Sequence, residues 1–354
     1  MLREFGMGSK KVRDVSFDIA RALGMLGVIV GHTLMGGQLT FTQNLVFEMN
    51  LPIFFFVSGY FFRKKTITST INSGINTLII PYLIGSLIWI GFNFIKYPGL
   101  ETVRNFTIAS VYAAGSQGQT LFGNGNYYIG ALWFLPAMFI STLLFQIIMR
   151  LKKQITKIIL ILALFLLGAY LGKQYVLPFS IAAVLEVQVF YLAGHLWRSY
   201  HSKVQENQLI YYCFLLINLF IWVIGAHSGW YGLNGGVAAN IWLATLGGLG
   251  TCFILLYIAK LIGNYATYLT RYLKWVGQFS LLFLFFNWFD ITFLNEIVIT
   301  NLQSPLTNIV NDSFARVITA TLRICWSSII VFGALKMNIV NRLFISRDYP
   351  IKNI

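Results

Sequence analysis

Arg21 and His32 lie within one apolar segment, residues 17–36, where an ionisable side chain is costly unless it serves a function. They are eleven residues apart, which in a helix corresponds to three turns plus about 20°. Both side chains therefore lie on one helix face, separated by a rise of about 16 Å. Asp18 is three residues before Arg21 and is placed to pair with it. The arginine suits an anion, and the imidazole suits proton transfer or covalent catalysis.

Each of these two residues also has a structural interpretation. Arg21 alone could extend to a membrane interface, and His32 alone could be a hydrogen-bonded histidine between packed helices. Gly24, Gly27 and Gly31 lie between them, and small residues let another helix or a thin ligand come close. The presence of both side chains on one face favours a functional role.

Glu48 is a second candidate for proton chemistry. It lies in the next apolar segment, 44–62, and the short connection 37–43 favours neighbouring helices. Its depth then matches that of His32, so its carboxylate would orient the imidazole. A glutamate that faces a helix dipole is the alternative, and the sequence leaves both open.

Several other polar side chains interrupt the later apolar segments. Each could line a polar cavity or pair with another helix, and the sequence assigns none of them a role. They are Glu186, Gln188, Asn287, Asp290, Glu296 and Arg323.

The composition indicates what surrounds these residues. Of the 354 residues, 57% are hydrophobic and 10% are charged, whereas about 25% are charged in a soluble domain. Lipid must therefore solvate much of the chain. The net charge of +15 comes from short clusters between apolar runs, which is typical of membrane loops and not of a nucleic-acid-binding face. The cysteines occur singly, without the spacing of a metal site, so we expect no metal.

The apolar runs predict the fold class, an all-α transmembrane bundle of about ten helices. Each run approaches the length that spans a bilayer, and none shows the two-residue alternation of a barrel strand. The predicted spans are 17–36, 44–62, 77–95, 130–148, 157–172, 180–198, 208–226, 238–259, 279–299 and 317–338.

Lysine and arginine predict the orientation. They fall mostly in alternate connections, as in multi-pass proteins whose basic loops are cytoplasmic. The other connections contain only Lys96, Arg104 and Lys173, with Arg316 at a border. We therefore expect a cell-membrane protein with a basic cytoplasmic N-terminus (1–16), a membrane domain (17–338) and a cytoplasmic C-terminal tail (339–354).

The longest outer connection, 96–130, contains Tyr112, Tyr127 and Tyr128 beside a Gly/Asn-rich stretch. Aromatic and amide side chains suit a carbohydrate. An interfacial aromatic belt with a flexible loop is the alternative.

Several blocks resemble the acyltransferase family 3 of integral-membrane proteins. The family's arginine and histidine, separated by ten residues, match Arg21 and His32 in FDIARALGMLGVIVGHT. The remaining blocks follow in the family's order across most of the chain. They are LPIFFFVSGYFFRKK (51–65), ALWFLPAMF (131–139), FYLAGHLW (190–197) and WVGQFSLLFLFFNW (275–288).

The resemblance implies transfer of an acyl group, usually acetyl from acetyl-CoA, to a hydroxyl of a cell-surface glycan or glycolipid. The implied partners are acyl-CoA, a carbohydrate acceptor and membrane lipid, with no nucleic acid. It implies that His32 is catalytic and that Arg21 contacts the donor or supports the site. From the residues themselves we expect Glu48 to support the imidazole, and the basic cluster Arg63, Lys64 and Lys65 to bind donor phosphates together with Arg21. The expected substrate contacts are Asp18, Asn50, Trp133 and Asn287.

Two positions depart from the family. Asn50 stands where members often have a histidine, and Asn287 stands where the late block often has one. An amide forms hydrogen bonds but does not shuttle protons. His32 is therefore the one evident proton carrier, acting as a base or as an acyl carrier. The rival interpretations are a transporter of glycans or lipid-linked sugars, and a scaffold for a polysaccharide synthase.

Overall fold

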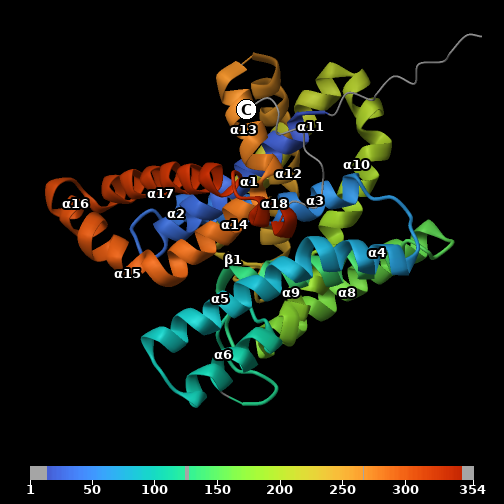
Figure 1. Ribbon diagram of the computed structural model, residues 1–354. Coiled ribbons are helices and arrows are strands. Elements are labelled where there is room, and N and C mark those ends of the chain that lie inside the picture. Colours follow the sequence, from blue (N-terminus) through green and yellow to red (C-terminus); the bar gives the residue numbers. More distant parts are fainter. Residues whose placement is uncertain (1–13, 124–126, 266, 345–354) are drawn as a thin grey trace, which may run out of the picture.

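The computed structural model describes residues 14–123, 127–265 and 267–344, and most of them are helical (Figure 1). The predicted fold class, an all-α bundle, is confirmed. The helices of the first half are α1 (Ser16–Leu34), α2 (Thr40–Asn50), α3 (Pro52–Tyr60), α4 (Ile67–Gly74), η1 (Ile75–Ile79), α5 (Ile80–Lys96), α6 (Leu100–Tyr112), η2 (Gly130–Trp133), α7 (Phe134–Ile148) and α8 (Gln154–Gln174).

The second half continues with short helical turns between longer helices, and β1 (Tyr231–Gly232) pairs antiparallel with β2 (Val237–Ala238). Its helices are η3 (Pro178–Ser180), α9 (Ile181–Glu186), α10 (Gln188–Glu206), α11 (Gln208–Ser228), α12 (Ile241–Tyr265), α13 (Thr267–Gln278), α14 (Ser280–Phe289), η4 (Asp290–Leu294), α15 (Asn295–Val298), η5 (Ile299–Gln303), α16 (Ser304–Ile309), α17 (Asp312–Ala334) and α18 (Asn338–Phe344).

Within the described residues, eight helical stretches are long and apolar enough to cross a membrane, and the bent pair α9–α10 makes a ninth. The predicted span 44–62 accounts for the difference from ten. It is divided into α2 and α3 at Leu51, because Pro52 cannot donate to the carbonyl of Glu48 and its ring clashes with that carbonyl. Asn50 accepts a 2.7 Å hydrogen bond from the amide of Leu51 at this break.

Two prolines lie next to π-helical turns. Pro81 follows η1 and Pro305 follows η5, and each lacks the amide proton that would bond to the carbonyl four residues earlier. The helix widens at these points instead of ending, which is a common cause of local distortion in membrane helices. The stretches Ile67–Lys96 and Ser280–Ile309 remain continuous across the turns.

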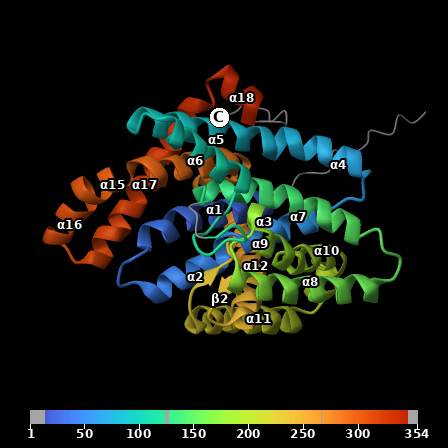
Figure 2. The same cartoon turned by 90° about the horizontal axis from the view of Figure 1, so that it is seen from below.

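Helix α1 occupies the interior of the bundle. Its apolar window is 72% buried, whereas that of α11 is 22% buried and faces outward. Figure 2 shows α4 and α5 along one side of the molecule and α11 along the other, with α1, α3, α7 and α12 between them. The long apolar side chains exposed on α8 and α11, such as Ile159 and Phe220, form the surface that lipid would cover.

Glycines set the closest crossings around α1 and α3. A Cβ on Gly277 of α13 would collide with the carbonyl of Asp18, and one on Gly194 of α10 would collide with that of Phe56. Gly24, Gly27 and Gly31 face residues of α2 and α3. These three glycines therefore let α2 and α3 approach α1 closely. The face of α1 that carries Arg21 and His32 is a different one and is available for other contacts.

The predicted tail, 339–354, lies partly outside the described residues, as does most of the predicted N-terminal segment 1–16. Residues 338–344 form α18, which packs on α5. The ring of Phe344 lies 5.0 Å from that of Phe285. The first part of the predicted tail is therefore packed against the bundle.

Candidate active site

Two cavities lie along one face of α1. Arg21, Met25 and Val28 line the first cavity, and Val28 and His32 line the second. The spacing of four, three and four residues keeps these side chains on one stripe of the helix, as the sequence predicted.

The first cavity, about 880 Å³ in volume, is basic. Arg21, Arg63 and Lys65 contribute to its lining, and none of the described residues that line it is acidic. Ser58, Thr77 and other hydroxyl and amide groups add hydrogen-bonding capacity. This composition suits a polyanion such as a phosphorylated ligand.

Arg21 is oriented by Asp18, one turn earlier. Its Nη2 lies 3.4 Å from Oδ1 of Asp18, whose side chain is 1% exposed while that of Arg21 is 22% exposed. The carboxylate is therefore behind the guanidinium and lines neither cavity. The structure makes Asp18 a support for Arg21 and not a wall of the site.

The second cavity, about 750 Å³ in volume, contains His32, Asn50 and Trp133. Three loops complete its wall, together with the last residues of α8 (172–174): 113–123 with 127–129, 175–176, and 229–237, which includes β1. They contribute polar and aromatic side chains suited to a hydroxylated ligand, which are Ser116, Gln117, Gln119, Tyr128, Gln174, Tyr175, Trp230, Tyr231 and Asn234.

Hydrogen bonds hold these three loops together. The amide of Val176 donates to the carbonyl of Gln119 at 2.8 Å, and Asn234 donates to the carbonyl of Gly115. The amide of Gly115 donates to Ser180 Oγ at 3.0 Å. The predicted Gly/Asn-rich stretch is described only in part, because residues 124–126 lie outside the described residues, but Tyr128 lines the cavity.

His32 lies near the end of α1 with one ring neighbour. The edge of Phe47 from α2 packs against it, with 5.8 Å between ring centroids at 86°. Neither imidazole nitrogen has a hydrogen-bond partner among the described residues, so both remain available to a ligand in the cavity.

Arg316 of α17 fixes the end of α1 that carries His32. Its Nη1 donates to the carbonyls of Thr33 at 3.2 Å and Met35 at 2.8 Å, and its Nε bonds to Asp312. These carbonyls have no partners within the helix, and a cation is favourable at a helix C-terminus. The hydrogen bonds of Arg316 thus connect the end of α1 to α17 beside the second cavity.

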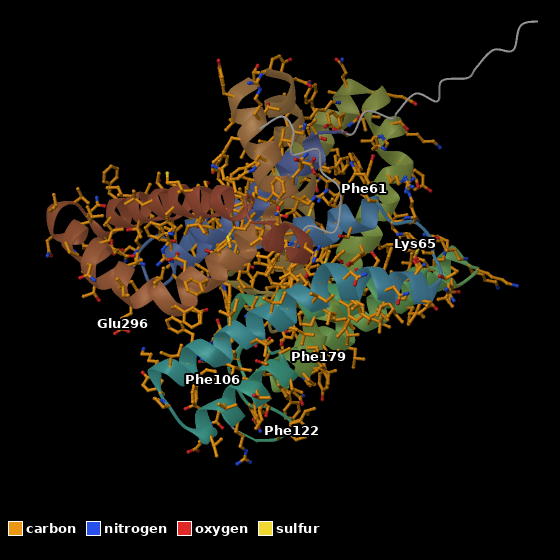
Figure 3. All side chains as sticks on the ribbon, in the orientation of Figure 1. Phe61, Lys65, Phe106, Phe122, Phe179 and Glu296 are labelled. Atoms are coloured by element: carbon orange, nitrogen blue, oxygen red, sulfur yellow. The ribbon has the colours of Figure 1, made fainter. Side chains whose placement is uncertain are left out.

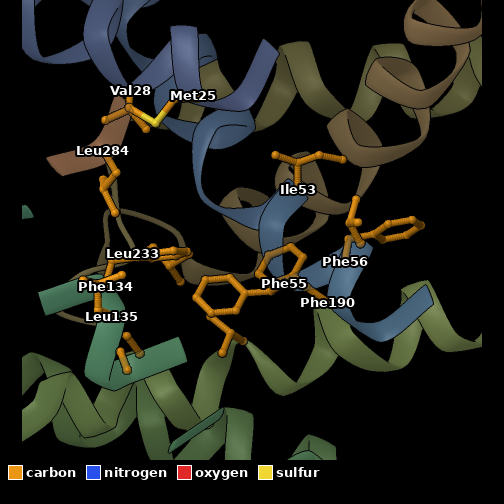
Figure 4. Close-up of a cluster of buried hydrophobic side chains, with 14 of the residues drawn as sticks. Met25, Val28, Ile53, Phe55, Phe56, Phe134, Leu135, Phe190, Leu233 and Leu284 are labelled. Atoms are coloured by element: carbon orange, nitrogen blue, oxygen red, sulfur yellow. The ribbon is translucent and has the colours of Figure 1, made fainter. Parts of the chain in front are cut away.

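The two cavities meet at an apolar collar formed by Val28, Leu51, Phe134 and Leu284, which line both of them. Figure 4 shows Leu284 of α14 between Val28 of α1 and Phe134 of α7. The collar separates the compartment of Arg21 from the one that contains the imidazole, and the second compartment has cations of its own in Lys173, Arg316 and Arg323. The two cavities extend to different parts of the molecule. Figure 3 labels Lys65, which lines the first cavity, and Glu296, which is next in sequence to Asn295 of the second cavity, and these two residues lie far apart.

Glu48 does not lie beside His32. A Cβ on Gly225 of α11 or on Gly247 of α12 would meet its carboxylate, which places that group between α11 and α12. The cause is helical periodicity, because Phe47 faces His32 and the next residue points about 100° away. The predicted support of the imidazole by Glu48 is therefore corrected.

Lys64 and Asn287 also line neither cavity. Asn287 is buried on α14, and its amide has no hydrogen-bond partner among the described residues. Of the predicted contacts, Arg21, Arg63 and Lys65 share the first cavity, while His32, Asn50 and Trp133 share the second.

Sequence reasoning assigned no role to Arg323, which lines the second cavity together with Asn295 and Gln303. The only signal in the sequence is its charge within an apolar run. It did not identify Tyr231 or Asn234 either, because their place in the wall depends on the fold of the loops.

Comparison with known proteins supports one family. The pattern of the acyltransferase domain of family 3 matches residues 14–333. The nodulation protein NolL of Mesorhizobium japonicum is 25% identical over 144 residues, which cover 38% of this chain and 36% of that protein. The chain thus spans about a third of the length of this relative. No solved structure matches the chain.

The matched residues 14–333 include helix α1 with Arg21 and His32, and the collar. They also include the residues of α1 to α17 that line the two cavities. Because the match covers most of the chain, the protein belongs to acyltransferase family 3.

Proposed function

We propose that the protein transfers an acetyl group from acetyl-CoA, held in the first cavity, to a hydroxyl of a glycan or glycolipid in the second. The observation that supports this most is the placement of Arg21 and His32. They lie on one stripe of α1, in two cavities that meet at the apolar collar.

The first cavity suits the donor. Its cations, Arg21, Arg63 and Lys65, would bind the phosphates of CoA, and no described acidic side chain in the lining opposes them. The pantetheine arm is thin and mostly apolar, so it suits passage between the side chains of the collar. The thioester would then reach His32 while the phosphates stay with the cations.

The second cavity suits the acceptor. Amides such as Gln117 and Asn234 both donate and accept hydrogen bonds, as sugar hydroxyls do. Trp230 and Tyr128 offer aromatic faces and edges. Asn50 and Trp133 would complete the contacts near His32.

His32 would perform the proton transfer. Its imidazole takes the proton of the acceptor hydroxyl as the oxygen bonds to the thioester carbon. The carbon–sulfur bond then breaks, and the departing thiolate takes the proton from the imidazolium to give CoA. If His32 carries the acyl group instead, its unprotonated ring nitrogen bonds to the thioester carbon, and the carbon–sulfur bond breaks to release the thiolate. The acceptor oxygen then bonds to that carbon, the carbon–nitrogen bond breaks to restore the imidazole, and the hydroxyl proton passes to the thiolate to give CoA.

We place the first cavity and both termini on the cytoplasmic side. The basic connections that predict this orientation include Arg63 and Lys65 at the first cavity. Acetyl-CoA is then available from the cytosol, and the acceptor is modified on the outer side. Labelling of single cysteines at Lys64 and Ser116 in sealed cells tests this: reaction of the Lys64 site from outside would reverse the orientation.

The test of the function is acetyl transfer by purified protein in lipid nanodiscs, with radiolabelled acetyl-CoA and a glycan acceptor. His32→Ala and His32→Asn should lower the transfer rate by about 10²–10⁴-fold. His227→Ala is the matched control, because His227 is exposed on α11 and lines neither cavity.

Near wild-type transfer by folded His32→Ala would rule out this mechanism. A folded wild type that transfers no acyl group from any acyl-CoA, yet moves a glycan across vesicles, would favour the transporter interpretation instead.

A further inference from the structure

Arg323 is a buried cation in the same cavity as His32. It lies on α17 with 1% of its surface exposed. A charge at such a position is costly in a membrane protein unless it is paired or used. Its partners come from the stretch Ser280–Ile309, which packs against α17.

Two of the three guanidinium nitrogens of Arg323, Nη2 and Nε, have neighbours that hold them in place. Its Nη2 donates to Oδ1 of Asn295 at 2.7 Å, and its Nε lies 3.4 Å from Oδ2 of Asp290. Its Nη1 has no hydrogen-bond partner among the described residues. Arg316, the other arginine of this cavity, is instead occupied by Asp312 and the end of α1.

Two π-helical turns build the wall that holds Arg323. Ile291, Asn295, Ile299 and Gln303 all line the cavity at intervals of four residues. In an α-helix each interval overshoots a full turn by about 40°, so three of them would carry Gln303 about 120° away from Ile291. The wider turns η4 and η5 cancel this drift, and π turns are frequent at functional sites.

The charge balance of the cavity favours an anion. None of the described residues that line it is acidic, and Asp290 lies behind the guanidinium without lining it. Arg323 and His32 line the same cavity, from α17 and α1 respectively. A negative charge that develops beside His32 would therefore meet a fixed donor from the α17 side.

We propose that Arg323 binds the carbonyl oxygen of the transferred acyl group and stabilises its negative charge during transfer. This assignment rests on the proposed function. When the acceptor oxygen bonds to the carbonyl carbon, the electron pair of the C=O bond moves to oxygen, and Arg323 donates to it. When the C=O bond reforms, the carbon–sulfur bond breaks and the thiolate leaves.

The main test is a double variant that keeps the interior neutral. Arg323→Gln alone would leave Asp290 buried without its cation, so Arg323→Gln is combined with Asp290→Asn. Asp290→Asn alone is the matched control, because it keeps the guanidinium. Arg323→Lys is a second test that keeps the charge but loses the planar donor.

Four quantities are measured in nanodiscs: kcat for transfer, KM for acetyl-CoA, KM for the acceptor, and the rate of acetyl-CoA hydrolysis without acceptor. The double variant should lower kcat and hydrolysis alike by about 10²–10³-fold, as loss of an oxyanion donor does, with KM for acetyl-CoA changed by less than about threefold. Asp290→Asn should cost less than about tenfold, and Arg323→Lys should lie between the two.

A double variant with kcat within about threefold of wild type would overturn the assignment. So would a loss confined to the KM for the acceptor with hydrolysis unchanged, because Arg323 would then bind an acidic group of the acceptor. If the double variant fails to fold, wild-type kcat in Arg323→Lys overturns it equally. A wild type without turnover would instead overturn the proposed function itself.

Discussion

Replacing Val28 by phenylalanine should close the apolar collar without removing the donor site. Val28 is 3% exposed and lines both cavities, so the larger ring has to occupy the space where they meet. Moving an added ring aside in a packed interior costs about 1–3 kcal/mol. At about 1.4 kcal/mol per factor of ten, the open collar becomes roughly 5- to 150-fold rarer.

We therefore expect Val28→Phe to lower kcat for acetyl transfer by a factor in this range. The affinity for acetyl-CoA should stay within about threefold, since in the proposed function the phosphates would contact Arg21, Arg63 and Lys65, which line the first cavity, and not the collar. Binding is measured with radiolabelled donor, and transfer is measured in the same nanodiscs.

Val30→Phe is the matched control. It makes the same change two residues further along α1, about 200° around the helix, at a residue that lines neither cavity. Unchanged transfer by folded Val28→Phe would refute the collar as the route of the thioester. An equal loss of donor binding would show instead that Val28 belongs to the donor site.

Three further variants test other parts of the structure. Arg21→Gln should raise the KM for acetyl-CoA, more so at low ionic strength where charges act further, and an unchanged KM would remove Arg21 from the donor site. Glu48→Gln should leave kcat within about threefold, because the carboxylate faces Gly225 and not His32; a large loss of kcat would restore its predicted role. Gly194→Ala should lower the melting temperature by overpacking, at a cost of about 1–3 kcal/mol, since its Cβ would meet the Phe56 carbonyl. Thermal unfolding in detergent checks this, and an unchanged midpoint would contradict the tight crossing.

The sequence predicts well those features that depend on periodicity within one helix. The eleven-residue spacing of Arg21 and His32 predicts one stripe, and the structure shows it. Apolar runs such as 208–226 predict helices such as α11 because a bilayer requires that length.

The sequence predicts poorly those features that depend on the rotation of one helix against another. Glu48 matches His32 in depth, but the direction in which it points depends on the packing of α2 against α11 and α12. Pro52 signals a break that a count of apolar residues overlooks. Arg323 reaches the cavity wall beside two π turns, and only the one before Pro305 has a marker in the sequence.

The division of the second cavity between helices and loops has an evolutionary consequence. His32 and Arg323 lie on α1 and α17, whereas most of the polar side chains that would contact an acceptor lie on the loops 113–123, 127–129, 175–176 and 229–237. Loops tolerate substitution and insertion better than the helices that they connect. Under the proposed function, a lineage can therefore change its acceptor by exchanging loop sequences, while His32 and Arg323, inherited on the helices, stay the same.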